Sequence, residues 1–114
     1  MTEIPNVHIV RKENVKVFLI LKKDHQLCDA QIEILNEKFG EHGYNVVEIP
    51  DDGLTMNEQV SLAKELKDTA ETVVFASELP VFEKYVKHYK IKWLVFVNDN
   101  EIVYTHNFKR WELF

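Results

Sequence analysis

Cysteine, glycine and proline are scarce in this chain of 114 residues, which holds one Cys, three Gly and three Pro. A single cysteine excludes an intrachain disulfide and any zinc module built from several cysteines. So few glycines and prolines exclude a collagen-like or low-complexity chain. Long apolar runs are missing too, since none exceeds five residues, whereas a membrane-spanning helix needs about 20. The sequence therefore predicts a globular domain with no membrane partner.

An excess of positive charge is also missing. Lys and Arg number 14 against 19 Asp and Glu, which gives a formal net charge of -5. Non-specific binding to duplex DNA requires clustered Lys and Arg that neutralise phosphates, so duplex DNA is not an expected partner. The start of the chain, Met1 to Pro5, lacks the basic and then apolar order of a secretory signal peptide. We therefore expect a cytoplasmic protein.

Apolar runs and amphipathic stretches alternate along the chain, without a repeat or a linker that would divide it. Four short runs are rich in apolar and β-branched residues, as strands covered on both faces are. We expect these strands over residues 15–21, 44–49, 72–76 and 91–97. After a turn at Asn98, Glu101–Thr105 predicts a returning antiparallel strand. Residues 1–14 form either an edge strand or an N-terminal arm.

Three stretches between these runs have the features of helices. The first begins near residue 28 and carries an apolar stripe made of Cys28, Ile32, Leu35 and Phe39, and Gly40 can end it. The second opens with a capping box, in which Thr55 and Glu58 satisfy each other's backbone N–H groups. The third begins at Pro80, which suits a first helical turn because its missing N–H is not needed there.

The resulting order is β-α-β-α-β-α-β-β. Helices between short apolar strands predict parallel pairing through right-handed crossovers, with helices on both faces of the sheet. We expect a single α/β domain over residues 1–114, with a small three-layer Rossmann-like or flavodoxin-like fold. The four parallel strands should follow the spatial order 2-1-3-4, with the antiparallel strand at the far edge. The aromatic C-terminal segment, residues 107–114, has no predicted form.

The expected ligand site lies beyond the carboxyl ends of the first and third strands. In an open α/β sheet, ligands bind at that edge, where the strand order reverses. There a lysine ammonium can hold a phosphate, and the helix start behind Ser77 favours an anion. The expected ligand-binding residues are Lys22, Asp24, Ser77, Glu78 and Asn98. The alternative is that these polar residues only build turns and cap helices.

Lys23 and His25 are the candidate catalytic residues. A histidine titrates near neutrality and can serve as general acid or base, while Lys23 holds a phosphate. The alternative is a hydrophilic loop between strand and helix, in which Asp24 helps to cap the helix.

Carboxylates follow several of the predicted strands and are oxygen ligands of the kind that Mg²⁺ takes, provided that their loops converge. They are Asp24, Asp51, Asp52, Glu78 and Asp99. The chain has neither a Gly-x-Gly-x-x-Gly motif nor a P-loop, so a dinucleotide is not expected. We expect no metal and no cofactor.

The segment from Val17–Leu21 through Asp24-His25-Gln26-Leu27, with Gln31 in the following helix, resembles small CRISPR-accessory proteins. Those proteins pair an N-terminal strand with a His-x-Leu-Thr-x-x-Gln helix start, in a domain like the cyclic-oligoadenylate sensors called CARF domains. His25 and Gln31 match this motif, whereas Ser77 shares only a loop position, in a turn that lacks the family's glycine. The resemblance implies a homodimer that binds a cyclic oligonucleotide. Some such proteins are ring nucleases, which cut the phosphodiester without a metal.

The leading interpretation is a small binding domain for a nucleotide-like or phosphate-bearing ligand, or for a protein partner. The first alternative is a metal-independent phosphodiesterase of ring-nuclease type, in which Lys22 or Lys23 holds phosphate and His25 is the acid or base. The second is a phage or mobile-element accessory protein that acts through a protein interface alone. Small size and the aromatic segment around Trp111 favour a homodimer.

Overall fold

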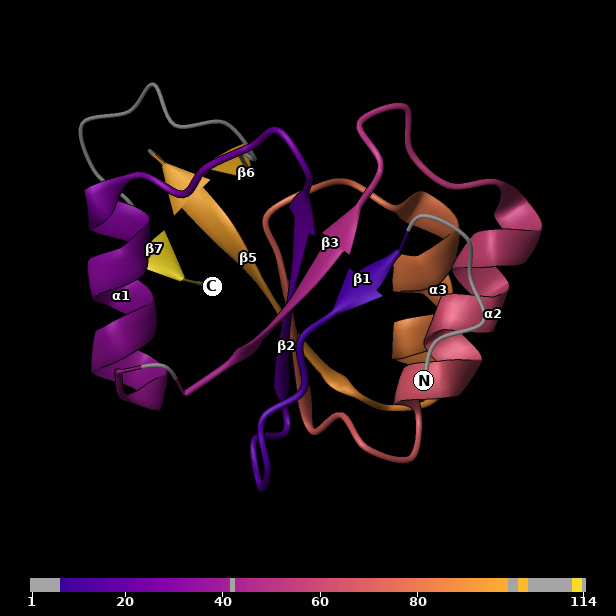
Figure 1. Ribbon diagram of the computed structural model, residues 1–114, viewed down its shortest axis with the longest axis horizontal. Coiled ribbons are helices and arrows are strands. Elements are labelled where there is room, and N and C mark those ends of the chain that lie inside the picture. Colours follow the sequence, from indigo (N-terminus) through magenta and orange to yellow (C-terminus); the bar gives the residue numbers. More distant parts are fainter. Residues whose placement is uncertain (1–6, 42, 99–100, 103–111, 114) are drawn as a thin grey trace.

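The computed structural model describes residues 7–41, 43–98, 101–102 and 112–113. Helices and strands alternate through most of this range (Figure 1). The helices are α1 (Asp29–Phe39), α2 (Met56–Leu66) and α3 (Pro80–His88). The strands are β1 (His8–Ile9), β2 (Val17–Lys22), β3 (Asn45–Ile49), β4 (Thr72–Phe75), β5 (Lys92–Asn98), β6 (Glu101–Ile102) and β7 (Glu112–Leu113). The predicted α/β class is confirmed. None of the helices in these ranges has the length and apolar character needed to cross a membrane.

The centre of the sheet is parallel, with the strand order β3-β2-β4-β5. This order matches the one expected from the sequence. β1 pairs antiparallel with β3, with His8 opposite Glu48, so the N-terminal segment includes an edge strand. β6 pairs antiparallel with β5, with Val97 opposite Ile102, as the returning strand was expected to do. The remaining predicted positions, 103–105, lie outside the described residues.

β7 is a strand that the sequence did not predict. It pairs antiparallel with β5, with Phe96 opposite Leu113. Val97 pairs with both Ile102 of β6 and Glu112 of β7, so these two short strands lie on opposite edges of β5. β7 also lies beside α1 (Figure 1). The aromatic residues Phe108, Trp111 and Phe114 lie outside the described residues.

Helices cover both faces of the sheet, α1 on one and α2 with α3 on the other (Figure 1). The chain moves from β2 to β3 through α1, and then in the opposite direction to β4 through α2. Crossovers of one hand that run in opposite directions place their helices on opposite faces. The α2–α3 face buries Phe18, Ile20, Leu62, Leu66, Phe75, Phe82 and Val86. The α1 face buries Leu19, Leu35, Val74, Leu94 and Phe96.

The predicted helix boundaries are confirmed where a specific residue caps the helix. The Thr55 hydroxyl accepts from the Glu58 N–H at 3.2 Å, and the Glu58 carboxylate accepts from the Thr55 N–H at 2.8 Å. Pro80 is the first residue of α3. Gly40 ends α1 with a φ of 84°, a left-handed conformation that glycine adopts without steric cost.

The predicted apolar stripe of α1 is wrong at one position. Ile32 is 37% exposed, whereas Gln31 is buried with 1% exposure. The helix is rotated so that Ala30, Ile34 and Leu35 pack against the sheet. Two apolar stripes one position apart fit this sequence, and only packing against the sheet decides between them.

Candidate functional site

Three loops meet at the carboxyl edge of the sheet. The Lys22 N–H donates to Ser77 Oγ at 3.0 Å, and the Lys23 N–H donates to the Ile49 carbonyl at 2.8 Å. The loop between β2 and α1 is therefore bonded on one side to the segment after β4 and on the other to the end of β3. This is the point at which the strand order reverses, so the predicted residues Lys22 and Ser77 come together where the site was expected.

Two carboxyl groups form the acidic part of this edge. The Asp24 N–H donates to Asp51 Oδ1 at 3.0 Å, which joins the β2–α1 loop to the loop after β3. The hydrogen bond between their side chains and the charge of the Asp51 carboxylate raise the pKa of Asp24 above its ordinary value. The side-chain and backbone hydrogen bonds from Asp24 lower the pKa of Asp51.

Cationic side chains surround this carboxyl pair. The charges of His25 and Lys22 help to lower the pKa of Asp51, and the charge of Lys23 opposes the upward shift at Asp24. His25 and Lys22 are half-buried, whereas Lys23 is exposed. Lys22, Lys23, Asp24 and His25 therefore form one charged cluster with Asp51, which follows β3 at the same edge of the sheet. The close mixture of charges suits a ligand that carries both a phosphate and hydroxyl groups.

Ser77 is buried, with 1% exposure, and its oxygen accepts the Lys22 N–H. It does not cap α3, because the N-cap of that helix is Leu79. The alternative interpretation of Ser77 as a helix cap is therefore wrong. Its predicted role in ligand binding stays a prediction, and its observed role is to join the two loops of the site.

The Ser77→Ala variant should lower the free energy of unfolding by about 1–3 kcal/mol, because it leaves the half-buried Lys22 N–H without an acceptor. Urea denaturation measures this loss. Ser61→Ala, at an exposed position of α2, is the matched control and should change stability by less than about 0.5 kcal/mol. Equal stability of the two variants would contradict a structural role for the Ser77 hydroxyl.

The remaining predicted residues are Glu78, Asn98 and the carboxylates considered for Mg²⁺. Glu78 is exposed in the loop after β4, and Asn98 ends β5, although its side chain lies outside what the structure describes. Of the five carboxylates considered for Mg²⁺, Asp24 and Asp51 are hydrogen-bonded to each other, and Asp99 lies outside the described residues. Within the described part of the chain, no group of three or more His, Cys, Asp and Glu side chains is placed to hold a metal ion.

Gln31 is a buried polar residue at the start of α1 that the apolar periodicity of this helix did not identify. Its Oε1 accepts the N–H of Cys28, the N-cap of α1, at 3.0 Å. Its Nε2 is buried and has no hydrogen-bond partner among the described residues. The signal in the sequence was the spacing, because Gln three residues after an N-cap is the second half of a capping box.

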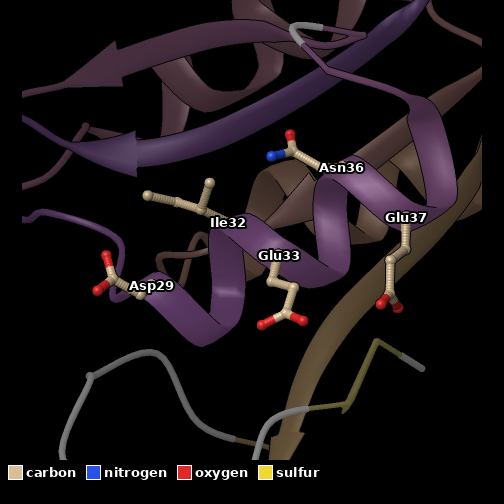
Figure 2. A pocket seen from close by; sticks show the side chains of 5 residues that line it. All are labelled: Asp29, Ile32, Glu33, Asn36 and Glu37. Carbon is tan, nitrogen blue, oxygen red and sulfur yellow. The ribbon is translucent and has the colours of Figure 1, made fainter.

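A cavity of about 470 Å³ lies along the outer side of α1 (Figure 2). It is lined by Asp29, Ile32, Glu33, Asn36 and Glu37. The three carboxylates give this cavity a negative charge, which would repel a phosphate. The cavity is therefore not the expected ligand site.

Comparison with protein-family models, with curated proteins and with solved structures found no match to this chain. The resemblance of the β2–α1 segment to CARF-like proteins, the homodimer and the protein partner stay predictions.

Proposed function

We propose that this protein binds a nucleotide-like, phosphate-bearing ligand at the carboxyl edge of the sheet, between the ends of β2 and β4. The observation that carries the proposal is the hydrogen bond from the Lys22 N–H to Ser77 Oγ, which joins two of the predicted loops at the reversal of strand order. The order β3-β2-β4-β5 supports a flavodoxin-like arrangement, and such sheets bind their ligands at that position.

The charged groups at this edge suit the two halves of a nucleotide. Lys22, Lys23 and His25 supply positive charge for a phosphate, and the N–H groups at the start of α1 favour an anion. Asp24 and Asp51 can accept hydrogen bonds from sugar hydroxyls. Inorganic phosphate has no sugar hydroxyls to donate hydrogen bonds to the two carboxylates. A nucleotide-like ligand therefore fits the site better.

A metal-independent phosphodiesterase is the second candidate, and one observation favours it. His25 lies close enough to Asp51 for its charge to lower the pKa of that carboxyl group. A carboxylate beside an imidazole stabilises the imidazolium that forms during general acid–base catalysis. In this role His25 transfers the proton, Asp51 stabilises the charged form of His25, and Lys23 holds the phosphate.

A thermal-shift panel of mononucleotides, cyclic dinucleotides and cyclic oligonucleotides tests the binding proposal. A ligand at about 100 times its dissociation constant adds about 2.7 kcal/mol of stability, which raises the Tm of a domain this small by several degrees. Lys23→Gln should weaken binding of the active ligand about tenfold, because a charged hydrogen bond is lost. Lys38→Gln removes the same charge from the last turn of α1 and should bind like the wild type.

Two outcomes would contradict this proposal: no shift with any nucleotide, or equal weakening by Lys23→Gln and Lys38→Gln. Turnover separates the two candidate functions. If the ligand is a cyclic oligonucleotide that is cut, His25→Ala should abolish cutting while a smaller thermal shift remains. If the ligand binds and is recovered intact, the protein acts as a binding domain and not as a phosphodiesterase.

A further inference from the structure

A basic and aromatic surface lies at the end of α3 and the start of β5. Residues 84–93 contain four lysines, one histidine, two tyrosines and one tryptophan, with no acidic residue among them. This stretch therefore carries a formal charge of +4 in a chain whose net charge is -5. We call it, together with Lys67 at the end of α2, the α3–β5 surface. Its cations Lys84, Lys87 and Lys90 and its imidazole His88 are exposed. Lys92 is not part of this surface, because its neighbour Trp93 packs against the α2–α3 core and successive strand residues point to opposite faces of a sheet.

The aromatic rings of this surface are held in place by one another and by the core. The ring centroids of Tyr85 and Tyr89 are 6.1 Å apart. The ring centroid of His88 lies 6.5 Å from that of Tyr85 and 5.5 Å from that of Tyr89. Both tyrosines are half-buried against the α2–α3 core, as is Trp93. These rings are therefore preorganised, and a ligand that stacks on them pays little entropy to order them.

Lysines lie directly against the rings. The Lys87 ammonium is 4.4 Å from the centroid of Trp93, and the Lys67 ammonium is 5.5 Å from that of Tyr89. Lys87 also pairs with Glu83 at 3.6 Å. These contacts join α2, α3 and β5 into one continuous surface in which positive charge and aromatic rings alternate.

We infer that the α3–β5 surface binds single-stranded nucleic acid. Cations that neutralise phosphates, combined with rings on which unpaired bases stack, are the two elements of such surfaces. A duplex keeps its bases stacked inside, so its phosphates would contact the lysines but its bases would not stack on the aromatic rings. An acidic peptide would likewise use only the charge. Cations at the end of α3 also stabilise that helix through its dipole, but this effect does not require the aromatic residues.

This inference is independent of the proposed nucleotide site. The turn between α3 and β5 precedes the first residue of β5, whereas the β2–α1 loop follows the last residue of β2. β2 and β5 belong to the same parallel sheet, so the two surfaces lie at opposite ends of it. Loss of one function should therefore leave the other intact.

Fluorescence anisotropy with labelled oligothymidylate and oligouridylate, measured across a range of salt concentrations, tests the inference. Lys84→Gln/Lys90→Gln removes two exposed charges of this surface and should lower the slope of log K against log salt by about 1.4. Relative to 1 M salt, the same loss of counterion release corresponds to binding about 25-fold weaker at 0.1 M salt. The matched control Lys12→Gln/Lys38→Gln removes two exposed charges on the α1 side of the sheet and should bind nearly as the wild type does.

A second variant tests the rings separately from the charge. His88→Ala should weaken binding about fivefold or more, whereas His88→Phe, which keeps an aromatic ring, should bind nearly as the wild type does. No binding of either oligonucleotide, or equal loss in the two lysine double variants, would overturn the inference. A third outcome would also overturn the inference: vesicles rich in anionic lipid bind with the same affinity as the oligonucleotides, and His88→Ala does not change that binding. The surface would then recognise a membrane through charge alone.

Discussion

Replacing Phe82 by alanine is expected to lower the free energy of unfolding by about 3–5 kcal/mol. The Phe82 side chain has no exposed surface, and its ring meets that of Phe75 edge to face, with centroids 5.7 Å apart. It therefore connects α3 to the central strand β4. Its removal loses buried apolar area and leaves a cavity that the surrounding side chains fill only in part. Because small domains are stable by about 5–15 kcal/mol, this is a large fraction of the total.

Urea denaturation of Phe82→Ala, followed by circular dichroism, measures this effect. Phe39→Ala is the matched control, because the same ring is removed from a half-buried position at the end of α1. We expect a loss about half as large there, in proportion to the smaller buried area. A loss below about 1 kcal/mol for Phe82→Ala would mean that α3 does not pack on β4 as described.

The second large effect is expected for Gln59→Leu, which should lower the free energy of unfolding by about 2–4 kcal/mol. Gln59 lies in α2, yet its Oε1 accepts the N–H groups of Val81 and Phe82 at 3.0 and 3.1 Å. Its Nε2 donates to the Leu54 carbonyl at 3.1 Å. The apolar Leu79 cannot cap α3, so Gln59 takes over that task from another helix. Leucine has a similar volume but leaves these backbone groups unsatisfied.

Two further variants separate lost hydrogen bonds from lost volume. Gln59→Glu keeps an acceptor for both N–H groups, and its negative charge suits the start of a helix. It should therefore recover part of the stability that Gln59→Leu loses. Gln26→Leu makes the same replacement at an exposed position and should change stability by less than about 0.5 kcal/mol. If Gln59→Leu is as stable as Gln26→Leu, the interhelical cap does not contribute.

Much of the local structure was predictable from the sequence because it depends on neighbouring residues. The apolar runs gave the four parallel strands to within two residues of their observed ends. Thr55 and Glu58 are three positions apart and satisfy each other, so the start of α2 needed no tertiary information. The expected site also followed from topology, because the carboxyl ends of parallel strands share one edge of the sheet. Lys22, Asp24 and Ser77 are at that edge for this reason.

Tertiary structure alone decided the features whose partners are distant in the chain. Ser77 and Lys22 are 55 positions apart, so the sequence could not show that the hydroxyl serves the neighbouring loop. The pairing of Asp24 with Asp51 depends on two loops from different strands. Gln31 rather than Ile32 is buried because the sheet selects which side of α1 packs against it. Local spacing determines the elements of this protein, whereas the identity of the buried and hydrogen-bonded polar groups is set by contacts that form only when those elements pack.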